Sequence, residues 1–267
     1  MLSAFALALC AGGELGLVEV ASSPAAPVQS RLALAYPVVR GPSLVAIPGI
    51  TLGQARVDAA GERRLRNLGA SMLLAFPDSS RGRLTVLLNA GLGAEAGRFG
   101  GSAFQSSCFL GWTLPGPRDK SWGLGASLSN SATGTSVTPI LTWDRLVRRD
   151  LRVAGVFPGP VALTWEASTA WKLGTRLAAQ GRSWVVDSSR SLTDVRFSTE
   201  LFVRRKLGPV GLDLAAGWTP YDHRRFVEND REALTIYGFD VFSSQKGRSL
   251  PNRSGPVGRI ALAFPAW

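Results

Sequence analysis

Hydrophobic side chains recur at every second position along most of this chain, and this period constrains the fold more than any other feature. In the segment 195–204, Val195, Phe197, Thr199, Leu201 and Val203 share one face, whereas the residues between them are mostly polar. A β-strand places alternate side chains on opposite faces, so a period of two predicts strands with one apolar face. We therefore expect an all-β protein.

The alternation recurs in about twelve segments, which turn-forming clusters at 77–80, 115–117 and 158–160 help to separate. The segments are 68–76, 84–90, 108–114, 122–128, 137–143, 151–157, 161–165, 171–177, 195–203, 212–218, 237–241 and 260–264. Their spacing predicts an up-and-down antiparallel barrel of about twelve strands. Because residues 31–40 and 50–57 can add strands, the expected range is roughly 10 to 14.

The face opposite the apolar one is small or polar and carries little charge. Gly123, Gly125 and Ser127 occupy that face in one segment, and only 18% of the whole chain is charged. A membrane barrel turns its apolar face to lipid and its polar face to the lumen, so the pattern favours a transmembrane β-barrel in a bacterial outer membrane. A secreted β-sandwich or a lipocalin-like binding protein is the alternative that gives similar alternation.

Tryptophans lie near the ends of the predicted strands, where a membrane barrel carries its interfacial aromatic belts. Six of the eight in the chain follow this rule: Trp112, Trp122, Trp143, Trp165, Trp171 and Trp218. Short charged connections at 144–149 and 204–208 and long polar ones at 181–193 and 220–231 are typical of periplasmic turns and external loops. If the lumen is filled, we expect the function to lie in the two long loops.

The first 30 residues differ in composition from the rest of the chain. They contain no Lys or Arg and two acidic residues, Glu14 and Glu19, although the whole chain has a formal charge of +11. Residues 2–10 form an apolar run as long as a signal-peptide core, and the small residues after it suit cleavage before Glu14. We expect a leader and an unstructured N-terminus over 1–30, followed by a single barrel domain over 31–267.

Basic residues fall on the inward face of the predicted strands. The candidates for lining the lumen are Arg152, Lys172, Arg176, Arg196, Arg204 and Arg259. Glu166, Glu200 and Asp213 are acidic residues of the same region that can pair with some of them. An open lumen with this basic excess would form a weakly anion-preferring channel, whereas ion pairs between these groups would fill a structural barrel. The sequence leaves both interpretations open.

One stretch, 138–165, carries a more specific order of signals. A strand begins near Pro139, a charged turn and a short apolar strand follow, and the turn at 158–160 leads directly into the next strand. From about Arg56 to Phe264 the chain resembles the uncharacterised bacterial outer-membrane β-barrels of domain-of-unknown-function family 6268. The resemblance implies a fold and an outer-membrane address, with membrane lipid and the barrel-assembly machinery as partners. It implies no ligand and no active residues.

Catalytic and metal-binding signatures are sparse. His223 is the one histidine and the chain has two cysteines, so we expect no metal site, no cofactor and no enzyme activity. An outer-membrane lipid-modifying enzyme that uses His223 to activate a serine is a lesser alternative. The glycine-rich segment 91–96 lacks the helix of a dinucleotide site. Dispersed basic residues argue against nucleic-acid binding.

Overall fold

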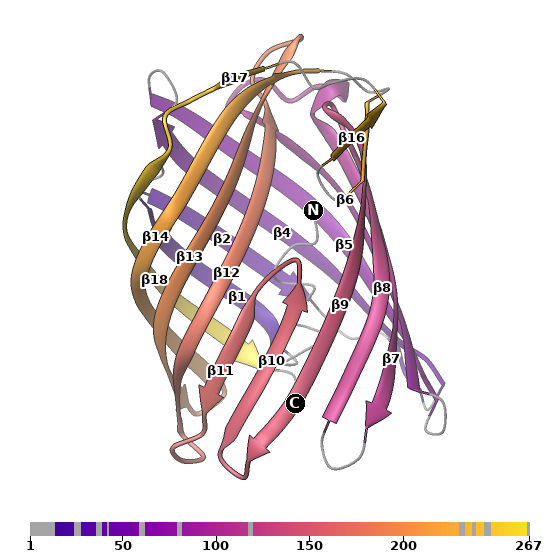
Figure 1. Cartoon of the computed structure of the whole chain (residues 1–267), viewed down its shortest axis with the longest axis vertical. Helices are drawn as coiled ribbons and strands as arrows, with labels where there is room; N and C mark the ends of the chain where they lie inside the picture. The colour runs from indigo at the N-terminus through magenta and orange to yellow at the C-terminus, as the bar shows by residue number, and fades with distance from the viewer. Residues whose placement is uncertain are drawn as a thin grey trace.

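The structure is a computed structural model that describes residues 14–23, 28–35, 39–41, 43–58, 62–78, 82–116, 120–229, 233–236, 239–242 and 247–265. These residues form a β-barrel whose strands tilt around a common axis (Figure 1). The leader expected before Glu14 lies outside the described residues. Within the described ranges, no helix combines the length and apolar character needed to cross a membrane.

Among the described residues, fourteen strands form the ring: β1 (Glu14–Ser22), β2 (Val28–Ala35), β4 (Val45–Asp58), β5 (Glu62–Asp78), β6 (Gly82–Glu95), β7 (Phe104–Gly116), β8 (Lys120–Ser131), β9 (Gly134–Arg148), β10 (Leu151–Phe157), β11 (Val161–Trp165), β12 (Trp171–Val185), β13 (Arg190–Leu207), β14 (Val210–Glu228) and β18 (Arg253–Pro265). The short elements outside it are β3 (Val39–Arg40), η1 (Gly101–Ala103), β15 (Leu234–Ile236), β16 (Phe239–Phe242) and β17 (Gly247–Ser249).

The ring closes because β1 pairs antiparallel with both β18 and β2. The predicted up-and-down antiparallel barrel is confirmed, with fourteen strands in place of about twelve. The expectation of an unstructured N-terminus up to residue 30 is wrong, since 14–22 and 28–35 are ring strands. Backbone groups that lack a partner in lipid cost several kcal/mol each, so β1 is needed to satisfy the facing edges of β2 and β18.

The outer face of the barrel is apolar over a band of limited height. Leu201, in the middle of β13, is 70% exposed, whereas its neighbours Glu200 and Phe202 point inward and are buried. On β5 the band runs from Leu68 to Phe76, which is roughly 26 Å along the strand. At a strand tilt of about 40° this spans ~20 Å along the barrel axis. That height is close to the ~25 Å apolar band of membrane barrels.

Aromatic side chains lie at both edges of this band. Trp112, Trp122, Trp165, Trp171 and Trp218 are all at least 40% exposed, and Trp143 lies opposite Trp122 in the β8–β9 pairing. Trp218 belongs to the other edge, where the rings of Phe197 and Tyr221 lie 5.8 Å apart. Trp184 differs from these six, since it is buried inside the barrel.

The two ends of the barrel differ. One end, the turn end, has the short connections 149–150, 166–170 and 208–209, together with the start of β1 opposite the end of β18. Gly208 adopts a φ of +60° there, which a two-residue turn between antiparallel strands favours. The other end, the loop end, has the longer connections 96–103 and 229–252, together with 186–189 and the two-residue turn 132–133.

The long loops predicted at 181–193 and 220–231 are mostly strand. β12 continues to Val185, β13 begins at Arg190 and β14 continues to Glu228, so the first loop shrinks to 186–189. The prediction was wrong because these strand ends extend past the apolar band, where polar residues can occupy both faces. The barrel therefore rises above the band at its loop end.

The hairpin of β10 and β11 is short and reaches about half the height of the barrel (Figure 1). Above it, β12 has no β11 partner beyond Leu177, and its end bridges to β6 between Val185 and Ala94. β15 pairs with the start of β9, where β10 does not reach. Opposite walls of the barrel therefore meet at the loop end.

We expect the Leu201→Arg substitution to lower the free energy of unfolding in lipid vesicles by about 2–4 kcal/mol, because it places a charge in the middle of the apolar band. The matched control is Leu207→Arg, since Leu207 is also exposed but lies at the turn end of the same strand. This control should cost no more than about 1 kcal/mol. Denaturant titration of both variants measures the difference, and equal costs would contradict the position of the band.

Candidate functional site

Charged side chains gather on one half of the barrel interior, on the neighbouring strands β12, β13, β14, β18, β1 and β2. We call this set the charged wall. Its basic members are Arg31, Arg176, Arg182, Arg196, Arg204, Arg224 and Arg259, and its acidic members are Glu19, Asp194, Glu200, Asp213 and Asp222. Bases and acids alternate across the strands: Asp194 is opposite Arg182 on one side and Arg224 on the other. Opposite charges therefore face one another in this row, as Arg176 and Glu200 do in another.

Asp213 on β14 is the centre of the lower part of the charged wall. Its side chain is 2% exposed and accepts hydrogen bonds from Arg259 at 2.8 Å and from Arg204 at 3.0 Å. Arg259 also contacts Glu19 at 3.4 Å and lies 4.0 Å from Glu200, which in turn pairs with Arg176. Four strands are thus joined to β1 by one continuous set of ion pairs.

Glutamine side chains hold the arginines in the upper part of the charged wall. Gln29 Oε1 accepts hydrogen bonds from Arg182 Nη1 at 3.0 Å and from Arg196 Nη2 at 3.2 Å. Arg196 Nη2 also donates to Gln180 Oε1 at 3.2 Å. Asp194 and Asp222 are carboxylates at the same level, and the amide oxygens add neutral acceptors beside them.

Two of the predicted lumen residues, Arg152 and Lys172, lie nearer the turn end and more in solvent. Arg152 Nε donates to Asp144 at 2.7 Å, and Lys172 Nζ donates to Glu166 at 2.5 Å. Their side chains are 48% and 45% exposed, so each pair contributes about 0–1 kcal/mol. The structure brings Arg176, Arg204 and Arg259 together around Glu200 and Asp213, and places Arg196 one level higher.

The other half of the interior has fewer charges among the described residues and surrounds an apolar cluster with small and polar side chains. Leu73, Leu87, Phe109, Ile140 and Val156 form a buried cluster contributed by β5, β6, β7, β9 and β10. The Phe109 ring lies directly against the backbone of Gly111, where a Cβ atom would be only 2.3 Å from the ring. The small inward residues therefore leave room for a large ring inside the barrel.

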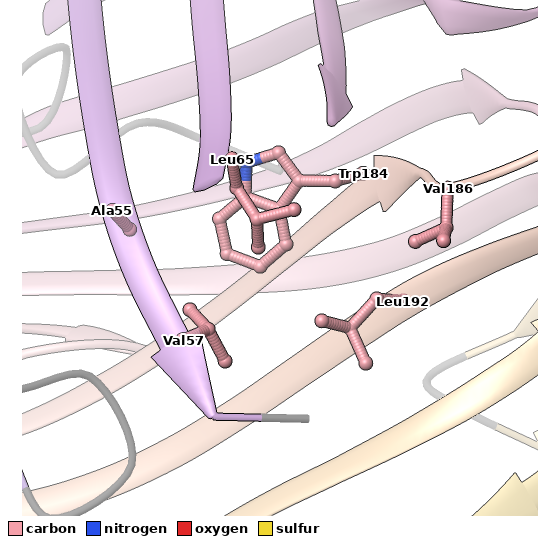
Figure 2. Close-up of a cluster of buried hydrophobic side chains, with 6 residues drawn as sticks. All are labelled: Ala55, Val57, Leu65, Trp184, Val186 and Leu192. Carbon is pink, nitrogen blue, oxygen red and sulfur yellow. The ribbon is translucent and has the colours of Figure 1, made fainter. Parts of the chain in front are cut away.

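A second apolar cluster closes the interior at the loop end (Figure 2). We call it the apolar cap, and its buried members are Ala55, Val57, Leu65, Trp184, Val186 and Leu192. Leu65 comes from β5 and Trp184 from β12, and Figure 2 shows the two side chains lying against each other. Since these strands belong to opposite walls, the cap joins the walls across the interior.

Polar contacts surround the apolar cap. Arg63 Nη1 pairs with Glu95 at 3.0 Å, and the Arg63 guanidinium lies 5.5 Å from the centre of the Phe226 ring, which packs on the cap. In the loop after β12, partial burial acts to raise the pKa of Asp187, but hydrogen bonds from Arg190 and Ser189 lower it below its usual value. The loop end is thus held in one arrangement by both apolar and polar contacts.

His223 lies within β14 and not in the loop where the sequence placed it. Its ring stacks on Tyr221, with 5.6 Å between the ring centres. Cys108 on β7 is a free, half-buried thiol. Within the part of the chain that the structure describes, no three His, Cys, Asp or Glu side chains gather in a way that could hold a metal ion.

Several members of the charged wall were missed from sequence. Arg182 and Arg224 fall in segments predicted as loops, and Glu19 falls in the predicted leader region. A usable signal was present, because Lys172, Arg176 and Arg182 share one parity along β12. Extending the period of two through polar segments would have found these residues.

Comparisons with known proteins give likeness of fold. No protein-family model and no curated protein matches the chain. Among solved structures, a NanC porin is 9% identical over 93% of this chain and 98% of that chain, with a TM-score of 0.44. The ferric-catecholate import receptor Fiu from E. coli K12, in its closed form, is 10% identical over 94% of this chain and 48% of that one, with a TM-score of 0.28. The β-domain of the Bordetella autotransporter BrkA is 10% identical over 93% and 96%, with a TM-score of 0.28.

The class of protein follows from the geometry of the chain itself. A closed antiparallel ring, an apolar outer band of bilayer height and aromatic side chains at both edges of that band define a membrane-spanning β-barrel. Among the described residues, the interior carries most of its charges on one half, mixes polar and apolar side chains on the other, and has the apolar cap near the loop end. The resemblance to family 6268 stays a prediction.

We expect the Asp213→Asn substitution to destabilise the barrel by about 3–5 kcal/mol, because it leaves Arg204 and Arg259 without their shared buried carboxylate. The matched control is Asp144→Asn, which breaks the exposed pair with Arg152 and should cost less than about 1 kcal/mol. Denaturant unfolding in detergent micelles measures both. Similar small losses for the two variants would show that the Asp213 contacts do not hold the wall together.

Proposed function

We propose that this protein is an outer-membrane β-barrel that forms a narrow conduit for small anionic solutes, closed in the state described. The charged wall is the observation that carries the proposal, since it has seven basic and five acidic residues among the described positions. A net positive charge on the wall of a low-dielectric interior raises the local concentration of anions. The excess is small, so the expected anion preference is weak.

The difference between the two barrel ends supports an orientation. Outer-membrane barrels carry short turns on the periplasmic side and longer loops outside. The turn end has connections of two to five described residues at 208–209, 149–150 and 166–170, and both ends of the ring lie there. We infer that the turn end faces the periplasm and that the loop end faces the outside.

The apolar cap closes the conduit on the outer side. Trp184, Leu65 and Leu192 are at most 3% exposed and fill the interior between opposite walls. The bridge between β12 and β6 narrows the same level. A solute passes only if this contact opens, which makes the cap the barrier to conduction.

A structural barrel is the second candidate function. The ion pairs of Arg176, Arg204 and Arg259 with buried carboxylates favour it, because paired charges fill the lumen and rigidify the wall. In that case the functional residues are at the loop end, and opening the apolar cap produces no ion conduction.

We expect the Trp184→Ala, Leu192→Ala double variant to show conductance steps in planar bilayers at least about tenfold more often than the wild type. Truncating both side chains weakens the wall-to-wall contact, and each ~1.4 kcal/mol of lost closure gives a factor of ten. In a chloride salt gradient, the reversal potential should lie on the anion-selective side.

The matched control for this experiment is Trp165→Ala, which removes a tryptophan from the outer face and leaves the cap intact. Its step frequency should equal that of the wild type. Cation selectivity in the cap variant would overturn the anion preference. Absence of steps in a correctly folded cap variant would favour the structural barrel.

The wild-type protein should need detergent for extraction from membranes and should migrate differently on a gel before and after boiling. Both results follow from a closed barrel with a lipid-facing exterior. A secreted β-sandwich or lipocalin-like protein would do neither. Recovery in the soluble fraction without detergent would therefore contradict the membrane assignment.

A further inference from the structure

Three arginines point outward directly above the apolar band. Arg56 on β4 and Arg64 on β5 are opposite each other, and Arg66 lies opposite Gln54 in the next row toward the band. All three side chains are exposed, and within the described residues none of them forms an ion pair. The following row, Leu52 opposite Leu68, already belongs to the apolar band. We call Arg56, Arg64 and Arg66 the arginine row.

Like charges directly opposite each other on neighbouring strands destabilise a sheet unless an anion lies between them. On the outward face of β5, Glu62 is the nearest acidic residue and lies one row farther from the band, while Glu95 is on the inward face and pairs with Arg63. The arginines therefore lie between the apolar band and Glu62, at the level where lipid headgroups meet the acyl region. This arrangement is complementary to phosphate groups at the membrane surface.

An apolar groove lies on the same strands, directly below the arginine row. It has a volume of about 830 Å³ and is lined by Leu34, Pro48, Ile50, Ala70, Leu88 and Ala90 among others. The floor is formed by Ala70 and Ala90, which are paired across β5 and β6, while Ile50 and Leu88 stand at the sides with 51% and 44% exposure.

The arginine row and the groove are close enough for one lipid molecule to contact both. Arg66 and Ala70 are on the same face of β5, four residues apart, which is about 13 Å along the strand. Leu68, 48% exposed, lies between them and continues the apolar surface. A lipid with phosphate on its headgroup reaches both, with the phosphate at the arginines and an acyl chain in the groove.

We propose that β2, β4, β5 and β6 form a binding site for a phosphorylated lipid of the outer leaflet. Arg56, Arg64 and Arg66 bind the headgroup phosphates, and the small residues Ala70 and Ala90 make room for an acyl chain. The site is on the outside of the barrel, so it goes beyond the conduit proposed above and needs no conduction. It uses only the inference that the loop end faces outward.

The test measures binding of diphosphoryl lipid A to the full-length barrel in a non-ionic detergent, by native mass spectrometry and by titration. The Arg56→Ser, Arg64→Ser, Arg66→Ser triple variant should bind on the order of 100-fold more weakly, since each basic side chain near an anionic surface adds to affinity. The matched control is Arg145→Ser, Arg148→Ser, Arg149→Ser, which removes three exposed arginines at the turn end and should leave the affinity unchanged.

A second pair of variants tests the groove. Ala70→Leu, Ala90→Leu fills its floor and should weaken lipid A binding by about tenfold, because two leucines displace the acyl chain. Ala126→Leu makes the same kind of substitution once, at an exposed position on β8 away from the groove, and should have no effect. The gel shift on boiling verifies that every variant is folded.

Competition with inorganic phosphate distinguishes a site for a phosphorylated lipid from a site for free phosphate. If it competes with lipid A only at much higher concentration, the acyl chain contributes and the lipid site stands. If it binds as tightly as lipid A, or if the triple variant keeps wild-type affinity, the proposal is overturned. A cap variant that conducts but binds lipid A normally would show that the two proposals are independent.

Discussion

The closed ring of backbone hydrogen bonds is the constraint on which the rest of this structure depends. A strand in lipid finds no water for its N–H and C=O groups, so every strand needs a neighbour on both sides. The pairing of β1 with β18 supplies the last of these contacts. Once the ring is closed, alternate side chains of each strand point to the outer face and to the interior. In the middle of β13, odd positions such as Leu201 are exposed on the outer face, and even positions such as Glu200 are buried in the interior.

Closure also explains why the interior charges are arranged in rows. Strand register places inward residues of neighbouring strands opposite each other, so Asp194 on β13 meets Arg182 on β12 and Arg224 on β14. Buried carboxylates such as Asp213 are tolerable only with such partners, because an unpaired charge in this environment loses its solvation. The same rows leave a small basic excess among the described residues, and amide oxygens accept hydrogen bonds from Arg182 and Arg196.

The sequence predicted the fold class and the parity of most strands, because alternation is a local property that needs no knowledge of neighbours. It missed β1, since the apolar run at 2–10 and the small residues after it are typical of a processed leader, and the prediction extended that leader region to residue 30. It also shortened β12, β13 and β14, whose polar ends rise above the apolar band. The contacts of Asp213 with Arg204 and Arg259 depend on register between strands, and the contact of Trp184 with Leu65 depends on the short β10–β11 hairpin. The sequence of a single strand predicts neither its register with its neighbours nor its contacts with the opposite wall.

The position of an arginine in this barrel decides its chemistry. On the inward parity, Arg259 is surrounded by carboxylates of three strands and stabilises the wall. On the outward parity and two rows above the apolar band, Arg56 and Arg64 face each other without such partners among the described residues, at the place proposed for lipid phosphates. Composition alone assigns all of these residues to one basic excess. The face of the strand and the position along the barrel axis divide these arginines into a group that lines the interior and a group that lies on the outer surface. Substitutions in one group therefore test a different proposal from substitutions in the other.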